Sequence, residues 1–268
     1  MSVNIDILSS RKGSNPGGLC YFRAPRLEFK GHFKYCLGSK INGLSSFKAE
    51  NQPVYEAITF ELARFLGLKT VDSFVIRNDN LDVYFDGWKE VGEINPSGRK
   101  FYFISKFIDN LVASDLNTNI CCDVPEREII YLDSLLISDI VGRKQNYIMD
   151  PNSRDSITYL DLGCSFVHAH NGFMTQPNKL KINDSKSIKR AYKILKDIHI
   201  IGRDNDSIIN LSELAEMPFN MSIYTLNPWK FVKVSDLITY EEIEEIHLHL
   251  VQSLIDCLPR FKKSGIIL

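Results

Sequence analysis

A glycine-rich turn near the N-terminus has a composition suited to phosphate binding. Residues 13–18 (GSNPGG) come directly before a β-prone run, and such a turn can direct several backbone N–H groups toward one anion. The turn is neither a Walker motif nor a GxGxxG sequence, and glycine and proline also punctuate ordinary surface loops. Ser14, Gly17 and Gly18 are therefore candidate phosphate contacts, with a plain surface turn as the alternative.

Lys40 and Glu56 form a second candidate pair. Lys40 ends the run FKYCLGSK, and Glu56 lies near the start of the clearest helix in the sequence. A lysine at a strand end, oriented by a carboxylate on the next helix, can hold the α- and β-phosphates of a nucleotide. Lys34 in the same run and Glu50 just before the helix are the competing residues. Solvated side chains are the other alternative, because lysine and glutamate are mostly exposed.

Three polar residues in the middle of the chain suit phosphoryl transfer. Asp139 ends a predicted helix, Asn146 follows in a loop, and Asp161 ends a predicted strand as the first residue of an Asp-Leu-Gly tripeptide. Phosphoryl transfer uses one carboxylate to orient the attacking hydroxyl, and an Asn with a second Asp supplies hard oxygen ligands for magnesium. Asp139 is thus the candidate base, with Asn146 and Asp161 as candidate magnesium ligands.

The elements that must position these residues follow a two-part order. Strands are predicted in the first part at residues 18–23, 26–30, 32–37, 70–77, 81–85 and 100–108, with one helix over 53–67. Helices are predicted in the second part at residues 125–141, 185–200 and 241–258, with a strand at 157–160 before Asp161. The acidic start of the last helix, at residues 241–245, is expected to be solvated. This order predicts an α+β fold of two lobes with a cleft between them.

Composition and charge exclude several classes of function. Hydrophobic residues make up 44% and charged residues 24% of the 268 residues, which excludes wholesale disorder. The net charge of -1 offers no basic field for nucleic acid or an anionic membrane. No secretory signal or membrane-spanning apolar run is visible, and the six cysteines lack CxxC spacing, as in reduced cytosolic proteins. We therefore expect a cytoplasmic protein without nucleic-acid or membrane partners.

The order of these segments resembles that of the HipA-like serine/threonine kinases. The resemblance covers most of the chain and rests on GSNPGG, YCLGSK, VYEAITFELARFLGL, FYFISKFI, DIVGRKQN and YLDLG, in that order. It implies a bilobal kinase-like fold. Residues 1–108 would form a β-rich, nucleotide-covering N-lobe with one αC-type helix, and residues 109–268 a helical C-lobe that carries the catalytic and metal-binding loop.

The resemblance also implies an activity, the phosphorylation of serine or threonine in a protein substrate, dependent on ATP and magnesium. Lys40 would hold the α- and β-phosphates and Glu56 would orient Lys40. Asn146 and Asp161 would hold magnesium, and Asp139 would be the base. The further implied ATP contacts are Ser14, Gly17 and Gly18 in the turn, and Ser105 and Phe107 where a strand enters the hinge. The implied regulation is a regulatory or antitoxin protein partner and, as in some relatives, phosphorylation of the turn itself.

The spacing around the candidate base departs from the family pattern. In the family the catalytic Asp precedes the metal-binding Asn by five residues, and that position holds Val141 here, whereas Asp139 lies seven residues before Asn146. Either an insertion of two residues leaves Asp139 as the base or the base is absent. The alternative function is therefore a degenerate kinase-fold protein that binds nucleotide or a protein partner without phosphoryl transfer. A lipid kinase is a third possibility, disfavoured by the near-neutral charge.

Overall fold

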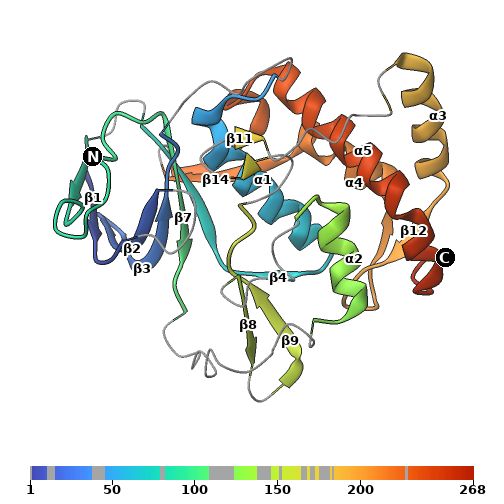
Figure 1. Ribbon diagram of the computed structural model, residues 1–268, viewed down its shortest axis with the longest axis horizontal. Helices are drawn as coiled ribbons and strands as arrows, with labels where there is room; N and C mark the ends of the chain where they lie inside the picture. The colour runs from blue at the N-terminus through green and yellow to red at the C-terminus, as the bar shows by residue number, and fades with distance from the viewer. Residues whose placement is uncertain are drawn as a thin grey trace.

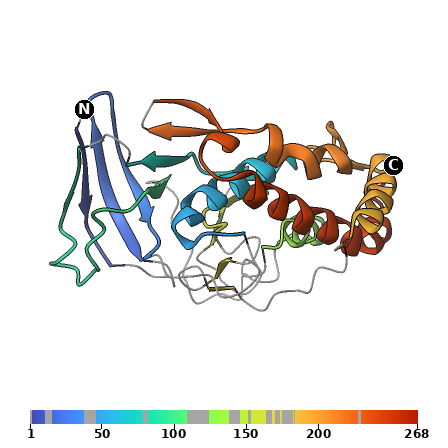
Figure 2. The ribbon, with the colours of Figure 1, turned by 90° about the horizontal axis from the view of Figure 1, so that it is seen from above.

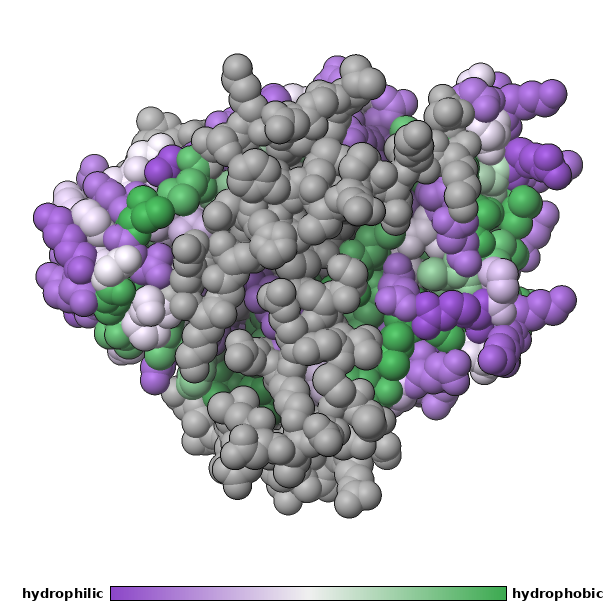
Figure 3. Space-filling view, viewed as in Figure 1, coloured by the Kyte–Doolittle hydropathy of each residue, from purple (hydrophilic) through white to green (hydrophobic). Residues whose placement is uncertain are grey.

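The computed structural model is an α+β protein in the residues that it describes, which confirms the general fold class predicted from the sequence. These are residues 2–10, 16–37, 46–78, 82–108, 124–137, 146–150, 153–163, 168–169, 173–174, 182, 184–226 and 229–268. The N-terminal strands gather at one end of the molecule and the later helices at the other (Figure 1). Both ends present mostly hydrophilic side chains with scattered hydrophobic ones (Figure 3).

An eight-stranded mixed sheet dominates the N-terminal end, with the strand order β15-β14-β5-β7-β3-β2-β1-β6. Its strands are β1 (Ser2–Ile7), β2 (Gly17–Ala24), β3 (Leu27–Lys34), β5 (Ser73–Arg77), β6 (Asp82–Asp86), β7 (Phe101–Lys106), β14 (Ser222–Leu226) and β15 (Trp229–Lys233). The hairpin β14–β15 comes from the second half of the chain, yet it extends this sheet through β5. The division at residue 108 stays a prediction.

Strand β3 corrects one sequence expectation. The two runs predicted on either side of Gly31 form one continuous strand, which ends at Lys34. Gly31 is needed because β7 passes so close that a Cβ there would lie 2.7 Å from the carbonyl oxygen of Ser105. The side chains of β3 alternate, with Phe29 and Phe33 buried and Lys34 on the opposite face.

Helix α1 (Gln52–Phe65) lies between the sheet and the other helices (Figure 2). Pro53 occupies its first turn, and Gly67 follows its end with a φ of +80°, as is common for a helix C-terminus. A short 3-10 helix, η1 (Ala49–Asn51), precedes it. Eleven of the 14 residues of α1 are buried, among them Val54, Ile58 and Leu62 in the larger hydrophobic core, so α1 is covered on most of its circumference.

Four further helices form the other end of the described structure. They are α2 (Glu126–Ser134), α3 (Ser185–Lys196), α4 (Leu211–Asn220) and α5 (Tyr240–Lys263), with the 3-10 helix η3 (Val234–Asp236) before α5. Helix α2 ends earlier than the predicted residue 141, because Leu136 adopts a left-handed φ of 60°. No helix in the described part of the chain is long and apolar enough to cross a membrane.

Three small sheets complete the described part of the structure. Strands β4 (Lys69–Thr70), β8 (Tyr147–Asp150) and β9 (Ser153–Tyr159) form one of them. The others pair β10 (His168–Ala169) with β11 (Phe173–Met174), and β12 (His199–Ile201) with β13 (Ile208–Asn210). Strand β9 contains most of the strand predicted at 157–160 and leads directly to Asp161.

Candidate functional site

Three charged residues from distant parts of the chain meet at the side of α1. The Nζ atom of Lys34, at the end of β3, lies 2.6 Å from Oε1 of Glu56 on α1 and 2.7 Å from Oδ1 of Asp161, which follows β9. The Lys34 side chain is 18% exposed, that of Glu56 2% and that of Asp161 37%. We call these three residues the Lys34 cluster. It opens to solvent on the side of Asp161.

The local structure explains why Lys34 reaches this place. Lys34 pairs with Phe103 of β7, and its ammonium lies 5.8 Å from the centroid of the Phe103 ring. Phe103 belongs to the core under α1, so this face of the sheet faces the helix. A lysine on the same face therefore meets the carboxylate that α1 presents.

The electrostatics of the cluster favour the charged form of each partner. Burial would lower the pKa of Lys34, but the carboxylates of Asp161 and Glu56 outweigh it and raise that pKa above its usual range. Burial would raise the pKa of Asp161, but the Lys34 ammonium and the N–H of Gly163 hold it below its ordinary value. Lys34 is therefore a fixed cation and Asp161 a fixed anion at neutral pH.

Gly163 lies against the cluster. Its N–H donates to Oδ1 of Asp161 at 3.0 Å, and a Cβ built on Gly163 would lie 2.8 Å from Oε2 of Glu56. The third residue of the Asp-Leu-Gly tripeptide is therefore glycine because the Glu56 carboxylate needs that space.

The substitution Gly163→Ala should destabilise the protein by about 2 kcal/mol, because the new methyl group must displace a buried, ion-paired carboxylate. Urea unfolding would measure the loss. In a Glu56→Ala background the clashing carboxylate is gone, so the same substitution should cost much less. Equal losses in the two backgrounds would show that Gly163 is needed for another reason.

The backbone of Asn146 lies next to that of Asp161, and the roles of the two residues as magnesium ligands stay a prediction. The carbonyl oxygen of Asn146 accepts from the N–H of Leu160 at 2.8 Å and from that of Asp161 at 3.3 Å. Asn146 is 6% exposed. Nowhere in the described ranges do three or more His, Cys, Asp or Glu side chains gather as metal ligands. Magnesium usually takes one or two protein carboxylates together with substrate phosphates, so an Asp–Asn pair still suits it.

The predicted hinge contacts lie beside the cluster on the β7 side. Ser105 is 2% exposed and pairs with His32, which precedes Lys34 by two residues on the same face of β3. The rings of Phe107 and His32 are 5.6 Å apart, and Lys30 Nζ lies 4.9 Å from the Phe107 centroid. Phe107 and His32 thus bring two rings together beside the face of β3 that carries Lys34.

Gly17 and Gly18 also lie near the cluster, and their conformation has a structural cause. Gly17 pairs with Lys34 in the β2–β3 ladder. A Cβ at Gly17 would lie 1.9 Å from the carbonyl oxygen of Phe33, and one at Gly18 would lie 1.9 Å from that of Ser9. Close backbone packing therefore requires both glycines, whatever the turn binds.

Several predicted site residues lie outside the described residues, namely Ser14, Lys40 and Asp139. Within the described part, Glu56 makes the expected ion pair with Lys34, the competing lysine of the sequence analysis. The alternation of apolar and polar residues along β3 is the signal that points to Lys34. Phe29 and Phe33 belong to one face, so Lys34 must belong to the other.

Comparison with known proteins does not supply a family for this chain: no family model, no curated protein and no solved structure matches it. The geometry of the Lys34 cluster is therefore the basis for assigning a function to this chain.

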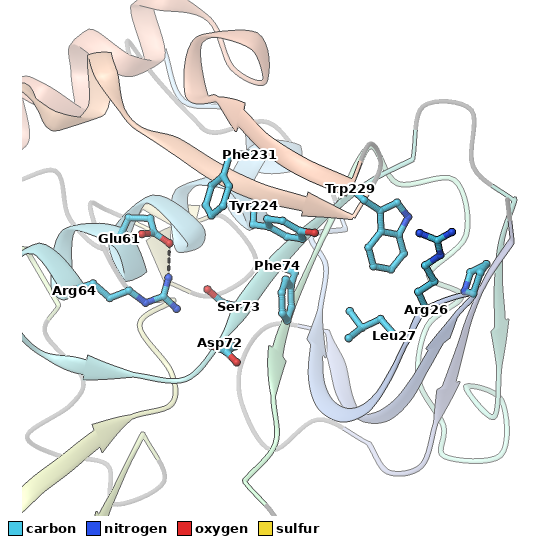
Figure 4. Close-up of a pocket in the computed structure, with 11 residues that line it drawn as sticks. Arg26, Leu27, Glu61, Arg64, Asp72, Ser73, Phe74, Tyr224, Trp229 and Phe231 are labelled. Atoms are coloured by element: carbon cyan, nitrogen blue, oxygen red, sulfur yellow. Dashed lines mark hydrogen bonds and ion pairs between the residues drawn. The ribbon is translucent and has the colours of Figure 1, made fainter.

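A concave region apart from the Lys34 cluster lies between the β14–β15 hairpin and the β2–β3 turn, with a volume of about 1070 Å³. We call it the aromatic groove. Phe74, Tyr224, Trp229 and Phe231 line one side, and Arg26 lies across from Trp229 (Figure 4). Its further lining residues are Pro25, Leu27, Glu61, Arg64, Asp72 and Ser73, and the charges of Glu61 and Arg64 are paired with each other. No member of the Lys34 cluster lines this groove.

Proposed function

We propose that this protein is an ATP- and magnesium-dependent kinase that phosphorylates serine or threonine in a protein substrate, as the HipA-like resemblance implies. The observation that carries the proposal is the Lys34 cluster, in which a strand lysine contacts both a helix carboxylate and the Asp of an Asp-Leu-Gly segment. A lysine–glutamate pair and a metal-binding Asp are recurring parts of phosphoryl-transfer sites.

The order of the described elements supports a bilobal kinase-like arrangement. The β2–β3 hairpin with a strand ending in lysine, the helix α1 with its glutamate, and the four strands β4 to β7 come first. The helices of the second half follow. The contiguous strands β5-β7-β3-β2-β1 would form the sheet of the N-lobe. Residues 107–108, directly after β7, would form the hinge.

In this proposal Lys34 takes the role predicted for Lys40. Its ammonium is held by two carboxylates, and the oxygens of α- and β-phosphates would compete for it as ligands of the same charge. Glu56 orients Lys34, and Asp161 and Asn146 would hold magnesium. Magnesium would supply charge neutralisation at the phosphates. Gly17 and Gly18 would bring backbone N–H groups to the phosphates. Ser105 and Phe107 would lie beside the adenine base of the nucleotide.

The proposed reaction transfers the γ-phosphoryl group of ATP to the substrate hydroxyl. The hydroxyl oxygen of the substrate Ser or Thr attacks the γ-phosphorus of ATP, and a new O–P bond forms. The bond from the γ-phosphorus to the β,γ-bridging oxygen breaks, and ADP leaves with its electron pair. The hydroxyl proton passes to a base, for which we propose Asp139. The substrate protein, a regulatory protein partner and a cytoplasmic location complete the proposal.

The second candidate function is a degenerate kinase-fold protein that binds nucleotide without transfer. The spacing between Asp139 and Asn146 favours it, because Val141 holds the position of the family's base. Both functions use the Lys34 cluster for nucleotide binding. They differ in whether a base is present.

The substitution Asp139→Asn separates these two functions. If Asp139 is the base, transfer to a generic protein acceptor should fall at least about 100-fold, while the midpoint shift produced by Mg·ATP in thermal unfolding stays as in the wild type. Radiolabelled phosphate transfer and a thermal shift assay measure the two properties. A wild type that binds Mg·ATP but transfers nothing would favour the degenerate binder, and full activity in Asp139→Asn would make another acid the base.

A further inference from the structure

Glu242 in the first turn of α5 is a buried carboxylate, not the solvated residue expected of the acidic run at 241–245. Its side chain is 0% exposed, while Glu241 and Glu244 of the same run are exposed. A buried carboxylate is costly unless hydrogen bonds and charge compensate it. The groups that contact Glu242 must therefore compensate the cost of burying its charge.

The partners of Glu242 come from the start of α1. Its Oε1 accepts from Nδ2 of Asn51 at 2.7 Å and from the hydroxyl of Tyr55. Its Oε2 accepts from the N–H of Thr239 at 2.9 Å, in a capping box of α5. Nζ of Lys48 lies 3.9 Å away. One carboxylate thus joins the first turn of α5 to the first turns of α1.

A second set of contacts ties the chain before α1 to the same helix. The N–H of Ser46 donates to Oε2 of Glu245 at 2.5 Å. The rings of Phe47 and His249 stack at 5.9 Å. Together with Glu242, these contacts attach the segment before α1 to the first turns of α5. We call these contacts the α5 clamp.

The α5 clamp acts on the part of α1 that carries Glu56. Asn51 and Tyr55 are four residues apart and face the same way, toward Glu242. Glu56 is the next residue after Tyr55 and faces Lys34. A rotation or shift of this turn would therefore change both contacts together.

A charged contact fixes geometry more strictly than an apolar one. Packing alone would tolerate a small rotation of α1, whereas hydrogen bonds weaken steeply when their angles change. The shared acceptor oxygen of Glu242 sets both the rotation and the height of this turn. This is a physical reason for the presence of a buried carboxylate where apolar residues would also pack.

We propose that Glu242 is a positioning residue, which fixes the first turns of α1 so that Glu56 holds Lys34 in its phosphate-binding position. The expected effect of Glu242 on nucleotide affinity rests on the proposed function. Its structural part, the coupling of Glu242 to Lys34 through α1, is testable without nucleotide.

The nucleotide test uses Tyr55→Phe and Glu242→Gln. Tyr55→Phe removes one hydroxyl and keeps the ring that packs against Phe47. It therefore tests the same contact if Glu242→Gln does not fold. Each should raise the Kd for Mg·ATP about ten-fold, the order expected for one hydrogen bond to a charged group. In a Glu56→Gln background the same changes should have little further effect, because they act through Glu56.

The test without nucleotide measures how fast an amine-acylating reagent modifies Lys34, at about pH 9, by mass spectrometry of the peptide. Acylation needs a free amine, and here the carboxylates of Glu56 and Asp161 hold the Lys34 Nζ atom at 2.6 and 2.7 Å. Both variants should increase the labelling of Lys34 several-fold. Tyr131→Phe is the matched control, since its hydroxyl bonds the carbonyl oxygen of Ile201 and takes no part in the α5 clamp, and it should leave Lys34 labelling unchanged.

Three outcomes distinguish the proposed function from the positioning role of Glu242. A wild type that does not bind Mg·ATP would overturn the proposed function, and the labelling result would still decide whether Glu242 positions Lys34. Unchanged labelling of Lys34 in both folded clamp variants would overturn the positioning role. An equal increase in Tyr131→Phe would also overturn it, because the effect would then reflect general loss of stability.

Discussion

Replacing Lys34 with methionine is expected to abolish detectable binding of Mg·ATP, with a loss of affinity of about 100-fold or more. Methionine keeps much of the aliphatic length and removes the ammonium. The same change leaves Glu56, whose side chain is 2% exposed, without its cation. We therefore also expect a loss of unfolding free energy of about 3 kcal/mol, as for one broken partner of a buried pair. Titration calorimetry and urea unfolding measure the two effects.

The matched control for this prediction is Lys40→Met. If Lys34 is the phosphate lysine, Lys40→Met should bind Mg·ATP as the wild type does and unfold at the same urea concentration. Normal ATP binding in Lys34→Met together with lost binding in Lys40→Met would return the role to Lys40.

The substitution Asp161→Asn is expected to reduce phosphoryl transfer about 1000-fold, because a metal-holding carboxylate contributes most in the transition state. Asparagine keeps the shape and loses the charge, so magnesium should no longer improve nucleotide affinity. Affinity measured with and without magnesium, together with a transfer assay, checks both effects. Asp184→Asn, at the exposed N-cap of α3, should change neither. Retained magnesium dependence in Asp161→Asn would remove Asp161 from the metal site.

The same substitution should change the acid stability of the protein. The pKa of Asp161 in the folded state lies below its ordinary value of 3.8. Its ion pair therefore contributes stability that is present above that value and is lost as the pH falls through the lower folded pKa. Asp161→Asn should flatten the fall in unfolding free energy below about pH 4. An identical acid dependence in both proteins would show that Asp161 is not held in its charged form.

The sequence predicted the α+β class and the main elements because their signals are local. Pro53, Gly67 and a regular apolar spacing predicted helix α1, and the structure confirms this helix. The preference for Lys40 over Lys34 also had a local basis. Gly31 was interpreted as a turn, so a strand was expected at residues 32–37 with Lys34 inside it. In the structure Gly31 is a strand residue that makes room for β7, and the strand ends at Lys34.

Contacts between residues far apart in the chain could not be predicted from a single sequence. Lys34 and Asp161 are 127 positions apart, and Asn51 and Glu242 are 191 apart. Nothing in the local pattern of the acidic run shows that Glu242 is buried while Glu241 is exposed. The two residues differ because one faces Asn51 and Tyr55 across the interface with α1 and the other faces solvent.

A crystal structure of the protein with magnesium and a non-hydrolysable ATP analogue would test most directly whether the Lys34 cluster binds nucleotide. We expect phosphate oxygens within hydrogen-bond distance of Lys34 Nζ, the metal ion coordinated by Asp161 and Asn146, and the adenine ring beside Phe107. A nucleotide bound elsewhere, for example in the aromatic groove, with the contact between Lys34 and Asp161 intact, would contradict this expectation.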